Sequence, residues 1–353
     1  MKENFYNVFV VGSPWHAYLA KIFFGKNDKY IIEYSSKKSL KSIKNSIQNK
    51  KDILKEINVE PLYFRNIFSL KNYFFAKNKF AKLQRFFSAL EVKNIYYFNS
   101  ESFLSLLIRS FNKKHSAVKI EDGVCDYLPF PLLQTNFFKN LIKTIVTKIL
   151  GVYHFYYPTN LKEIERGYFF FPDKQNRNYP TESLLDFKDD LVKIIKKTEP
   201  SDSIILNTSN SALVIGQTLY EDSYCDFKLE IDIYKQLIKS LKLKGIKKIY
   251  FKFHPRSSTK KIKSIELLKQ EFLELSIIEY DVSAEYLMVT NNFNLLVGFW
   301  SNSVIYSKPL FGIDSCTIMF SLLDTADNKF INKIAKVMSD KFPKFFIDFR
   351  KIS

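Results

Sequence analysis

The segment 7–24, NVFVVGSPWHAYLAKIFF, most constrains the fold, because it is typical of a strand, a tight turn and a helix in direct succession. An apolar run that is broken at Gly12 and Pro14 and then continues with helical spacing favours the first unit of a parallel α/β sheet. Further short apolar runs follow at 30–35, 94–99 and 116–123. Lys-rich segments such as 39–57 lie between these runs and are predicted to be helical. The alternation predicts a doubly wound sheet.

The same pattern restarts near residue 200, after the polar segment 196–203 with Pro200, which we interpret as a linker. The later elements are a strand followed by a loop at 203–214, an amphipathic helix at 230–246 that ends near Gly245, and strands running into loops at 247–258 and 294–303. A chain of 353 residues is long enough for two domains. We therefore expect two Rossmann-like domains, 1–198 and 199–353, that face a central cleft.

The chain carries 54 Lys and Arg against 36 Asp and Glu, a net charge of +18. Such a surface attracts polyanions, which include nucleic acid, acidic lipid and anionic sugar chains. An AT-rich genome, which favours Lys, Ile, Asn and Phe codons, is an alternative explanation of the charge. A nucleic-acid-binding protein is a second functional hypothesis, but the sequence has no zinc-finger spacing, RNP-like aromatic motif or clear helix-turn-helix.

Two basic, aromatic segments, 136–158 and 328–353, suggest contact with an anionic membrane surface. The alternative for the first is an ordinary amphipathic helix packed on its own domain, and the second could equally pack back on the protein. The three cysteines form no CxxC pair, which favours a reducing, cytoplasmic setting over a disulfide framework or zinc site. No signal peptide or transmembrane helix is expected. We expect a protein peripheral to the inner face of a bacterial inner membrane.

Three polar clusters stand where strands are predicted to end: EDG at 121–123, KFHPR at 252–256 and WSNS at 300–303. Each cluster alone is a weak signal, because acids with Gly, a His-Pro pair or a Ser/Asn run often form only a turn or a helix cap. Their occurrence together, at the carboxyl ends of strands where α/β proteins bind ligands, is more specific.

In this order the clusters resemble the motifs of bacterial sialyltransferases of glycosyltransferase family 52 and of the related family 38 capsule polysialyltransferases. Those families share an acidic pair before Gly, then a His-Pro motif, then a serine motif. The opening 10–20 also resembles their first strand, loop and helix, although His16 stands where that family often has Gln. The resemblance implies a GT-B-like fold, a CMP-sialic acid donor, inversion at the anomeric carbon, and no metal or other cofactor.

The resemblance assigns the catalytic roles to Glu121 and His254. A carboxylate in reach of an acceptor hydroxyl can take its proton as it attacks, and Glu121 matches the family's general base. Asp122 would support Glu121 or raise its pKa by like charge, and Gly123 would let the chain turn away. His254 matches the group that donates a proton or hydrogen bond to the leaving phosphate, with Pro255 fixing its turn.

The remaining site residues are assigned to the donor and the acceptor. Lys252 and Arg256 could meet the charge of the nucleotide. The serine motif would grip the donor phosphate through Ser301, Asn302 or Ser303 at a helix start, and Glu285 could hold the ribose hydroxyls. On the acceptor side we expect Ser13, Pro14 and His16.

The sequence thus predicts transfer of sialic acid to a hydroxyl of a bacterial surface glycan, either lipooligosaccharide or capsule. Alternatives with the same fold are another CMP-activated ulosonic acid as donor (pseudaminic acid, legionaminic acid or Kdo) and a polysialyltransferase. The expected partners are a CMP-sugar, a glycan or glycolipid acceptor and an anionic membrane, without nucleic acid.

Overall fold

The chain folds into two compact units. The computed structural model describes residues 6–63, 70–128, 137–156, 160–175, 177–198, 206–279, 282–323 and 329–351. Unit 1 comprises residues 1–122 and 133–194, and unit 2 comprises 123–132 and 195–353. The main division therefore follows Ile194, near the predicted boundary, whereas the assignment of 123–132 to unit 2 was not predicted. The predicted linker at Pro200 lies outside the described residues.

Unit 1 is built on a seven-stranded sheet in the order β3-β2-β1-β4-β5-β6-β7, in which all neighbouring strands are parallel. The strands are β1 (Val8–Val11), β2 (Lys29–Tyr34), β3 (Ile53–Asn58), β4 (Asn94–Tyr97), β5 (Ser116–Ile120), β6 (Arg166–Phe169) and β7 (Thr181–Ser183). The central strands β1 and β4 are buried along their whole length, as expected when helices cover both faces of a parallel sheet.

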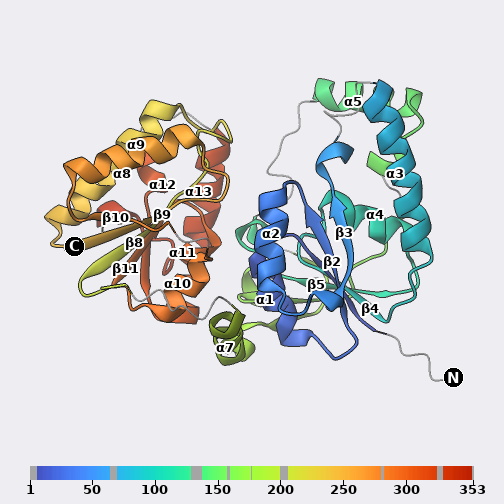
Figure 1. Cartoon of the computed structure of the whole chain (residues 1–353), viewed down its shortest axis with the longest axis horizontal. Helices are drawn as coiled ribbons and strands as arrows, with labels where there is room; N and C mark the ends of the chain where they lie inside the picture. The colour runs from blue at the N-terminus through green and yellow to red at the C-terminus, as the bar shows by residue number, and fades with distance from the viewer. Residues whose placement is uncertain are drawn as a thin grey trace. The chain divides into compact units, whose positions relative to one another are not determined.

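The helices of unit 1 are α1 (Pro14–Phe23), α2 (Lys37–Ser46), α3 (Leu70–Ser88), α4 (Phe103–Phe111), α5 (Phe137–Ile149), α6 (Tyr153–Tyr156) and α7 (Lys188–Thr198), whose last turn passes into unit 2. The helix α1 begins where the sequence predicts, because the Ser13 hydroxyl accepts the His16 N–H and Pro14 occupies the first helical position. The helices α1 and α2 pack together against the sheet (Figure 1).

The structure corrects the prediction that 39–57 is one helical segment. The helix α2 ends at Ser46, and the chain continues through a single turn into the strand β3. This strand lies at the edge of the sheet and exposes Lys55 and Glu56. Charged side chains are common on edge strands. They interrupt the alternation of apolar and polar residues by which a strand is recognised in the sequence.

Unit 2 contains a five-stranded parallel sheet in the order β10-β9-β8-β11-β12. The strands are β8 (Ser211–Ile215), β9 (Lys248–Lys252), β10 (Leu275–Ile277), β11 (Leu295–Gly298) and β12 (Asp314–Thr317). The helices are α8 (Phe227–Leu243), α9 (Thr259–Glu271), α10 (Ala284–Thr290), α11 (Asn302–Tyr306), α12 (Met319–Leu323) and α13 (Lys329–Lys341), with a π-helical turn at Ser307–Phe311. The predicted strand-then-loop order at 203–214 is wrong for its described part, since a turn at 206–210 precedes β8.

Each sheet reverses its strand order beside its first strand, at β1/β4 in unit 1 and at β8/β11 in unit 2. Ligands of doubly wound sheets bind beyond the carboxyl ends of the strands at such a reversal. The predicted site residues follow strands at or next to these reversals: Asp122 follows β5, which neighbours β4; His254 follows β9, which neighbours β8; and Ser301 follows β11. The sequence prediction of two doubly wound α/β domains is confirmed.

The two basic segments differ in what they expose. In the part of α5 whose side chains are described, 141–149, four apolar side chains are exposed, from 44% for Leu141 to 79% for Ile149, and Phe74 and Phe75 of α3 are 64% and 56% exposed. The Tyr73 hydroxyl donates to the Leu150 carbonyl at 2.6 Å, so α3 and the end of α5 lie side by side. The helix α13, by contrast, buries its apolar residues in unit 2. No helix in the described ranges combines the length and apolar character needed to cross a bilayer.

Candidate functional site

The loop after β1 holds His16 against Asp122. The Gly12 N–H donates to His16 Nδ1 at 3.0 Å, and His16 Nε2 lies 2.6 Å from Asp122 Oδ1. Because Nδ1 is used as an acceptor, Nε2 carries the proton that bonds the carboxylate. The imidazole also stacks on the Phe98 ring, with centroids 4.6 Å apart. The loop therefore fixes both the orientation and the tautomer of His16.

Asp122 is the member of the acidic pair that faces solvent, with 28% of its side chain exposed. Burial raises the pKa of its carboxyl group, but the charge and hydrogen bond of His16 and the charge of Lys119 outweigh burial, so the pKa lies below its ordinary value. Asp122 is therefore a carboxylate at neutral pH, in the state that a general base requires.

Glu121 is fully buried. Its Oε2 accepts the Phe170 N–H at 2.6 Å, and its own N–H donates to the Tyr168 carbonyl at 2.9 Å. These contacts tie the end of β5 to the end of β6. The sequence assigned the base to Glu121 and a supporting role to Asp122, whereas burial favours the reverse assignment.

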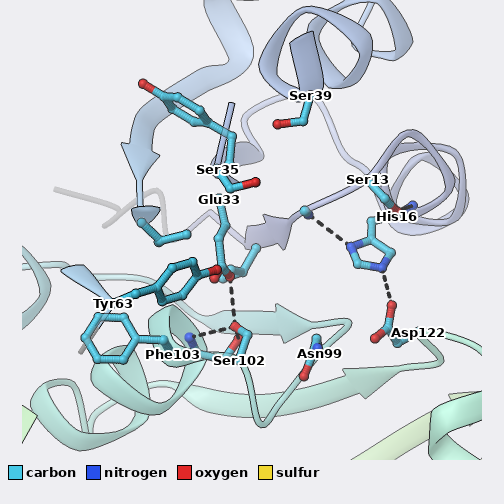
Figure 2. Close-up of a pocket in the computed structure, with 15 residues that line it drawn as sticks. Ser13, His16, Glu33, Ser35, Ser39, Tyr63, Asn99, Ser102, Phe103 and Asp122 are labelled. Carbon is cyan, nitrogen blue, oxygen red and sulfur yellow. Dashed lines mark hydrogen bonds and ion pairs between the residues drawn. The ribbon is translucent and has the colours of Figure 1, made fainter. Parts of the chain in front are cut away.

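A pocket of about 460 Å³ opens at the carboxyl ends of β1, β2 and β4 (Figure 2). Its polar lining residues are Ser13, His16, Glu33, Ser35, Ser39, Asn99, Ser102 and Asp122, together with Tyr34, Tyr63 and Ser105. Of the predicted acceptor-side residues, Ser13 and His16 line the pocket. Pro14 does not line it and starts α1 instead. The volume lies in the range of small-molecule sites.

Glu33, at the end of β2, is a pocket residue that the sequence analysis missed. Its Oε2 accepts the Ser102 hydroxyl at 2.8 Å, and it also accepts the Leu104 N–H in the first turn of α4. Burial, reinforced by the charge of Asp122, raises the pKa of the Glu33 carboxyl group despite these bonds and the charge of His16. The sequence did contain a signal for this residue, because Glu33 is the only charged residue in the apolar run YIIEY and stands near its end.

Gly123 begins the stretch of unit 2 that follows Asp122, and it contacts the serine motif. Its φ of +145° lies in a region of backbone conformation that residues other than glycine rarely adopt. A Cβ at this position would lie 2.0 Å from Asn302 Nδ2, and the Asn302 Oδ1 accepts the Val124 N–H at 2.8 Å. Asn302, predicted to contact the donor, thus holds the turn after the acidic pair.

His254 lies in the turn after β9. The Ser257 N–H donates to the His254 carbonyl at 2.9 Å around Pro255, and the Arg256 N–H donates to His254 Nδ1 at 3.1 Å. The proton of the neutral imidazole is therefore on Nε2. Burial, together with the charge of Arg256, lowers the pKa of His254 to about 4, so the free ring is neutral at pH 7.

Arg256 is held in place by a fork-like ion pair with Asp222, at 2.9 and 3.0 Å, and by the Thr218 hydroxyl at 3.2 Å. The loop that carries Asp222 is anchored by Lys261, whose buried Nζ lies 2.5 Å from Glu221 and 2.7 Å from Glu230. The sequence analysis missed these partners because they lie far from Arg256 along the chain. Lys252 ends β9, and its carbonyl accepts the Gly216 N–H at 2.8 Å.

The serine motif meets Glu285 at the end of β11. Ser301 caps α11 by accepting the Ser303 N–H at 3.3 Å, and the Ser303 hydroxyl donates to Glu285 Oε1 at 3.2 Å. Glu285 stands in the first turn of α10. The strands β9, β8 and β11 are consecutive in the sheet, so the His254 turn and the serine motif lie along one edge of unit 2. The structure thus brings the predicted donor residues to one edge of unit 2, and it brings Ser13 and His16 of the predicted acceptor residues to the pocket of unit 1.

Comparison with known proteins gives one family match. The model of the family described as alpha-2,8-polysialyltransferase (POLYST) matches residues 7–319. No match was found among curated proteins.

Among solved structures, similar chains are nucleotide-sugar epimerases. A Listeria monocytogenes protein described as a putative UDP-N-acetylglucosamine 2-epimerase has a TM-score of 0.53 at 8% identity, covering 98% of this chain and 92% of its own. The UDP-GlcNAc 2-epimerase of Neisseria meningitidis, bound to UDP-GlcNAc, has a TM-score of 0.51 at 11% identity, with coverages of 97% and 94%. The enzyme of Methanocaldococcus jannaschii, in complex with UDP-GlcNAc and UDP, has a TM-score of 0.50 at 12% identity, with coverages of 96% and 93%. At these identities the likeness concerns the fold, which is of the GT-B type.

Proposed function

Because the chain belongs to the alpha-2,8-polysialyltransferase family, we propose that it transfers sialic acid from CMP-sialic acid to a hydroxyl of a bacterial surface glycan, with inversion and without a metal. The family and the fold make it a glycosyltransferase of the sialyltransferase type, which uses a nucleotide-sugar donor and a glycan acceptor. The identity of the donor, the stereochemistry and the acceptor are the parts that we propose.

The observation that carries the proposal is the Arg256 N–H donated to His254 Nδ1. It leaves Nε2–H as a hydrogen-bond donor on a ring that is neutral in the free protein. A leaving CMP gains negative charge on its phosphate as the glycosidic bond breaks, and a donor fixed in advance stabilises that charge. The negative charge of an approaching phosphate also raises the pKa of the imidazole towards neutral pH. The protonated ring can then act as a general acid.

The acceptor side supplies the base. We assign that role to Asp122, which lines the pocket as a carboxylate and is held by His16, and we assign to Glu121 the task of anchoring the end of β5. The Asp122 carboxylate would take the proton of the acceptor hydroxyl as it attacks the anomeric carbon. Attack from the side opposite the leaving phosphate inverts that carbon.

The donor is assigned to unit 2. Ser301 and Ser303 would contact its phosphate, Glu285 would accept from the ribose hydroxyls, and Lys252 and Arg256 would balance its charge. The contact between Ser303 and Glu285 supports this assignment, because it gathers hydroxyl and carboxylate groups at one strand end. Asn302 acts indirectly, through the turn at Val124.

A donor and acceptor screen with the purified chain tests the proposal. CMP-sialic acid, CMP-pseudaminic acid, CMP-legionaminic acid and CMP-Kdo are each incubated with lipooligosaccharide and capsule-derived glycans, and the products are read by mass spectrometry. We expect transfer from CMP-sialic acid. Transfer from another CMP-sugar alone would change the donor, repeated additions would identify a polymerising enzyme, and no turnover of any CMP-sugar would reject the assignment.

We further propose that the protein is cytoplasmic and peripheral to the membrane, with α3 and α5 meeting anionic lipid. Exposed apolar side chains on these helices, interspersed with lysines such as Lys77, Lys143 and Lys148, support this role. A glycolipid acceptor would then be presented at the same surface to which the enzyme is bound.

A further inference from the structure

The pocket of unit 1 contrasts with the rest of the chain in its charge. The chain carries a net +18, yet within the part that the structure describes neither Lys nor Arg lines the pocket. Two carboxylates, those of Glu33 and Asp122, line it instead, and seven of its 15 lining residues carry a hydroxyl group. A surface rich in hydroxyls and carboxylates suits the many hydroxyl groups of a sugar.

At each helix start beside the pocket, at least one backbone N–H is accepted by a side chain of the protein itself. In α1 the His16 N–H is accepted by Ser13, and in α2 the Ser39 N–H is accepted by Ser36. At the start of α4 the protein's own anion, Glu33, accepts from Ser102 and Leu104. Helix N-termini commonly bind external anions, but here their donors are directed to side chains of the chain.

From these observations we propose that the pocket binds the terminal sugar of the acceptor, that this sugar is neutral, and that Glu33 is the residue that discriminates against a terminal sialic acid. The proposal rests on the transferase function proposed above and concerns its acceptor. It implies that the enzyme places a first sialic acid on a neutral glycan end and does not extend a sialic acid chain, although the family is named for polymerising enzymes.

The position of Glu33 explains the discrimination. Figure 2 shows its carboxyl group between the His16–Asp122 pair on one side and the Tyr63 and Phe103 rings on the other, so a bound sugar would meet it. A sugar hydroxyl can donate to this carboxylate or accept from its protonated form, whereas the carboxylate of sialic acid would lie against Glu33 and Asp122, and no Lys or Arg is among the described residues that line the pocket. The raised pKa of Glu33 indicates that the pocket already disfavours negative charge. The two aromatic rings offer an apolar wall for the C–H face of a sugar.

The test compares two acceptors of the same length, one ending in a neutral hexose and one ending in sialic acid. Binding of each to the full-length protein is measured by titration calorimetry without donor, and kcat/KM for transfer is measured with the CMP-sugar that proves active. We expect wild-type protein to favour the neutral end by at least about tenfold in both measurements. Equal or better binding of the sialylated end would overturn the proposal.

Glu33→Gln separates charge from shape. We expect this variant to weaken binding of the neutral acceptor several-fold and to narrow the preference between the two acceptors. If the variant prefers the neutral acceptor as strongly as the wild type does, Glu33 is not the residue that discriminates against sialic acid. The matched control is Glu56→Gln, which alters an acid of β3 that pairs with Lys44 at 2.7 Å outside the pocket. It should leave both affinities at the wild-type value.

Two readouts keep this inference distinct from the proposed function. Slow hydrolysis of the donor without acceptor reports the donor side alone, and it should be equal in wild-type and Glu56→Gln protein. If no CMP-sugar is hydrolysed or transferred, the transferase assignment fails, while the calorimetric preference still decides the chemistry of the pocket. If transfer occurs but the sialylated acceptor is preferred, only the present inference fails.

Discussion

The Val124 N–H donates to Asn302 Oδ1 at 2.8 Å, and this bond joins two motifs that are 178 residues apart in the chain. It places the turn after the acidic pair directly on the serine motif. Gly123 makes the contact possible, because the Asn302 side chain occupies the space that a Cβ would need. The turn that begins at Gly123 and the serine motif are thus parts of one packed structure in unit 2.

The first prediction concerns this packing. Gly123→Ala should destabilise the protein by roughly 1–3 kcal/mol from backbone strain alone, and by more from the overlap with Asn302. Asn302→Ala removes the overlap, so the double variant should lose less stability than the sum of the single variants. Denaturant unfolding measures the coupling. Gly151→Ala is the control, since its φ is +66° but nothing lies near its Cβ position; combined with Asn302→Ala it should be additive.

The second prediction separates the two acids. Asp122→Asn should lower kcat by roughly 10²–10⁴-fold, because it removes the carboxylate that lines the pocket, and should cost less stability than Glu121→Gln, because Asp122 is partly exposed. Glu121→Gln should cost about 1–3 kcal/mol of stability by disturbing a buried hydrogen-bonded group, with a smaller effect on kcat. Steady-state kinetics measures kcat, and urea unfolding of the same samples measures stability, so the two effects are compared in each variant. Loss of kcat in a fully stable Glu121→Gln protein would return the base to Glu121.

The third prediction concerns pH and His254. The pKa of the imidazole is about 4 in the folded protein against 6.5 ordinarily, so between these values the unfolded chain binds a proton that the folded chain does not. The stabilising effect is present above pH 6.5 and is lost as the pH falls towards 4. His254→Asn should therefore show a smaller loss of stability between pH 7.5 and 4.5 than the wild type in urea unfolding. An equal change of the free energy of unfolding with pH in the two proteins would contradict the low pKa of His254.

The fourth prediction concerns metals. If His254, Arg256 and Lys252 balance the charge of the leaving phosphate, dialysis against a chelator should leave the transfer rate unchanged. Transfer is assayed with EDTA in excess and after addition of Mg²⁺ or Mn²⁺. A rate that is lost with EDTA and restored by either ion would contradict metal independence.

The fifth prediction concerns the membrane. Replacing Ile145 and Ile149 of α5 by Glu should weaken binding to anionic lipid vesicles by at least about tenfold, because it removes apolar contact area and adds negative charge. Cosedimentation with vesicles of phosphatidylglycerol measures it. Leu273→Glu is the matched control, since Leu273 is 91% exposed on unit 2 and should not affect binding. Equal loss in the control would point to a general charge effect.

The sequence predicted the elements whose signals are local. The turn from β1 to α1 is marked by Gly12 and Pro14, and the end of α8 is marked by Gly245, whose φ is +80°. The strand β3 was missed because its exposed Lys55 and Glu56 resemble a helix surface. The strand β8 was placed too early because the apolar residues 204–206 resembled its start.

The candidate site, like the fold, was predictable only where its signals are local in the sequence. Acids and histidines at strand ends were found from the motifs, whereas the division of work that we propose for Glu121 and Asp122 rests on the burial of Glu121 and the partial exposure of Asp122, which the sequence does not show. Glu33 and Asp222 were missed because their roles depend on partners such as Ser102 and Arg256, which the fold brings from other strands. A sequence pattern cannot show such pairings.

The passage of the chain from unit 1 to unit 2 between Asp122 and Gly123 has a consequence for work with fragments. A fragment beginning at residue 199 would lack Val124 and Tyr127, whose contacts with Asn302 and Phe342 are part of unit 2. Conversely, a fragment ending at 198 would carry residues 123–128 without Asn302 and Phe342, with which they pack in unit 2. The two halves of this protein are therefore not separable by a single cut, and the acidic pair lies at one of the crossings that join them.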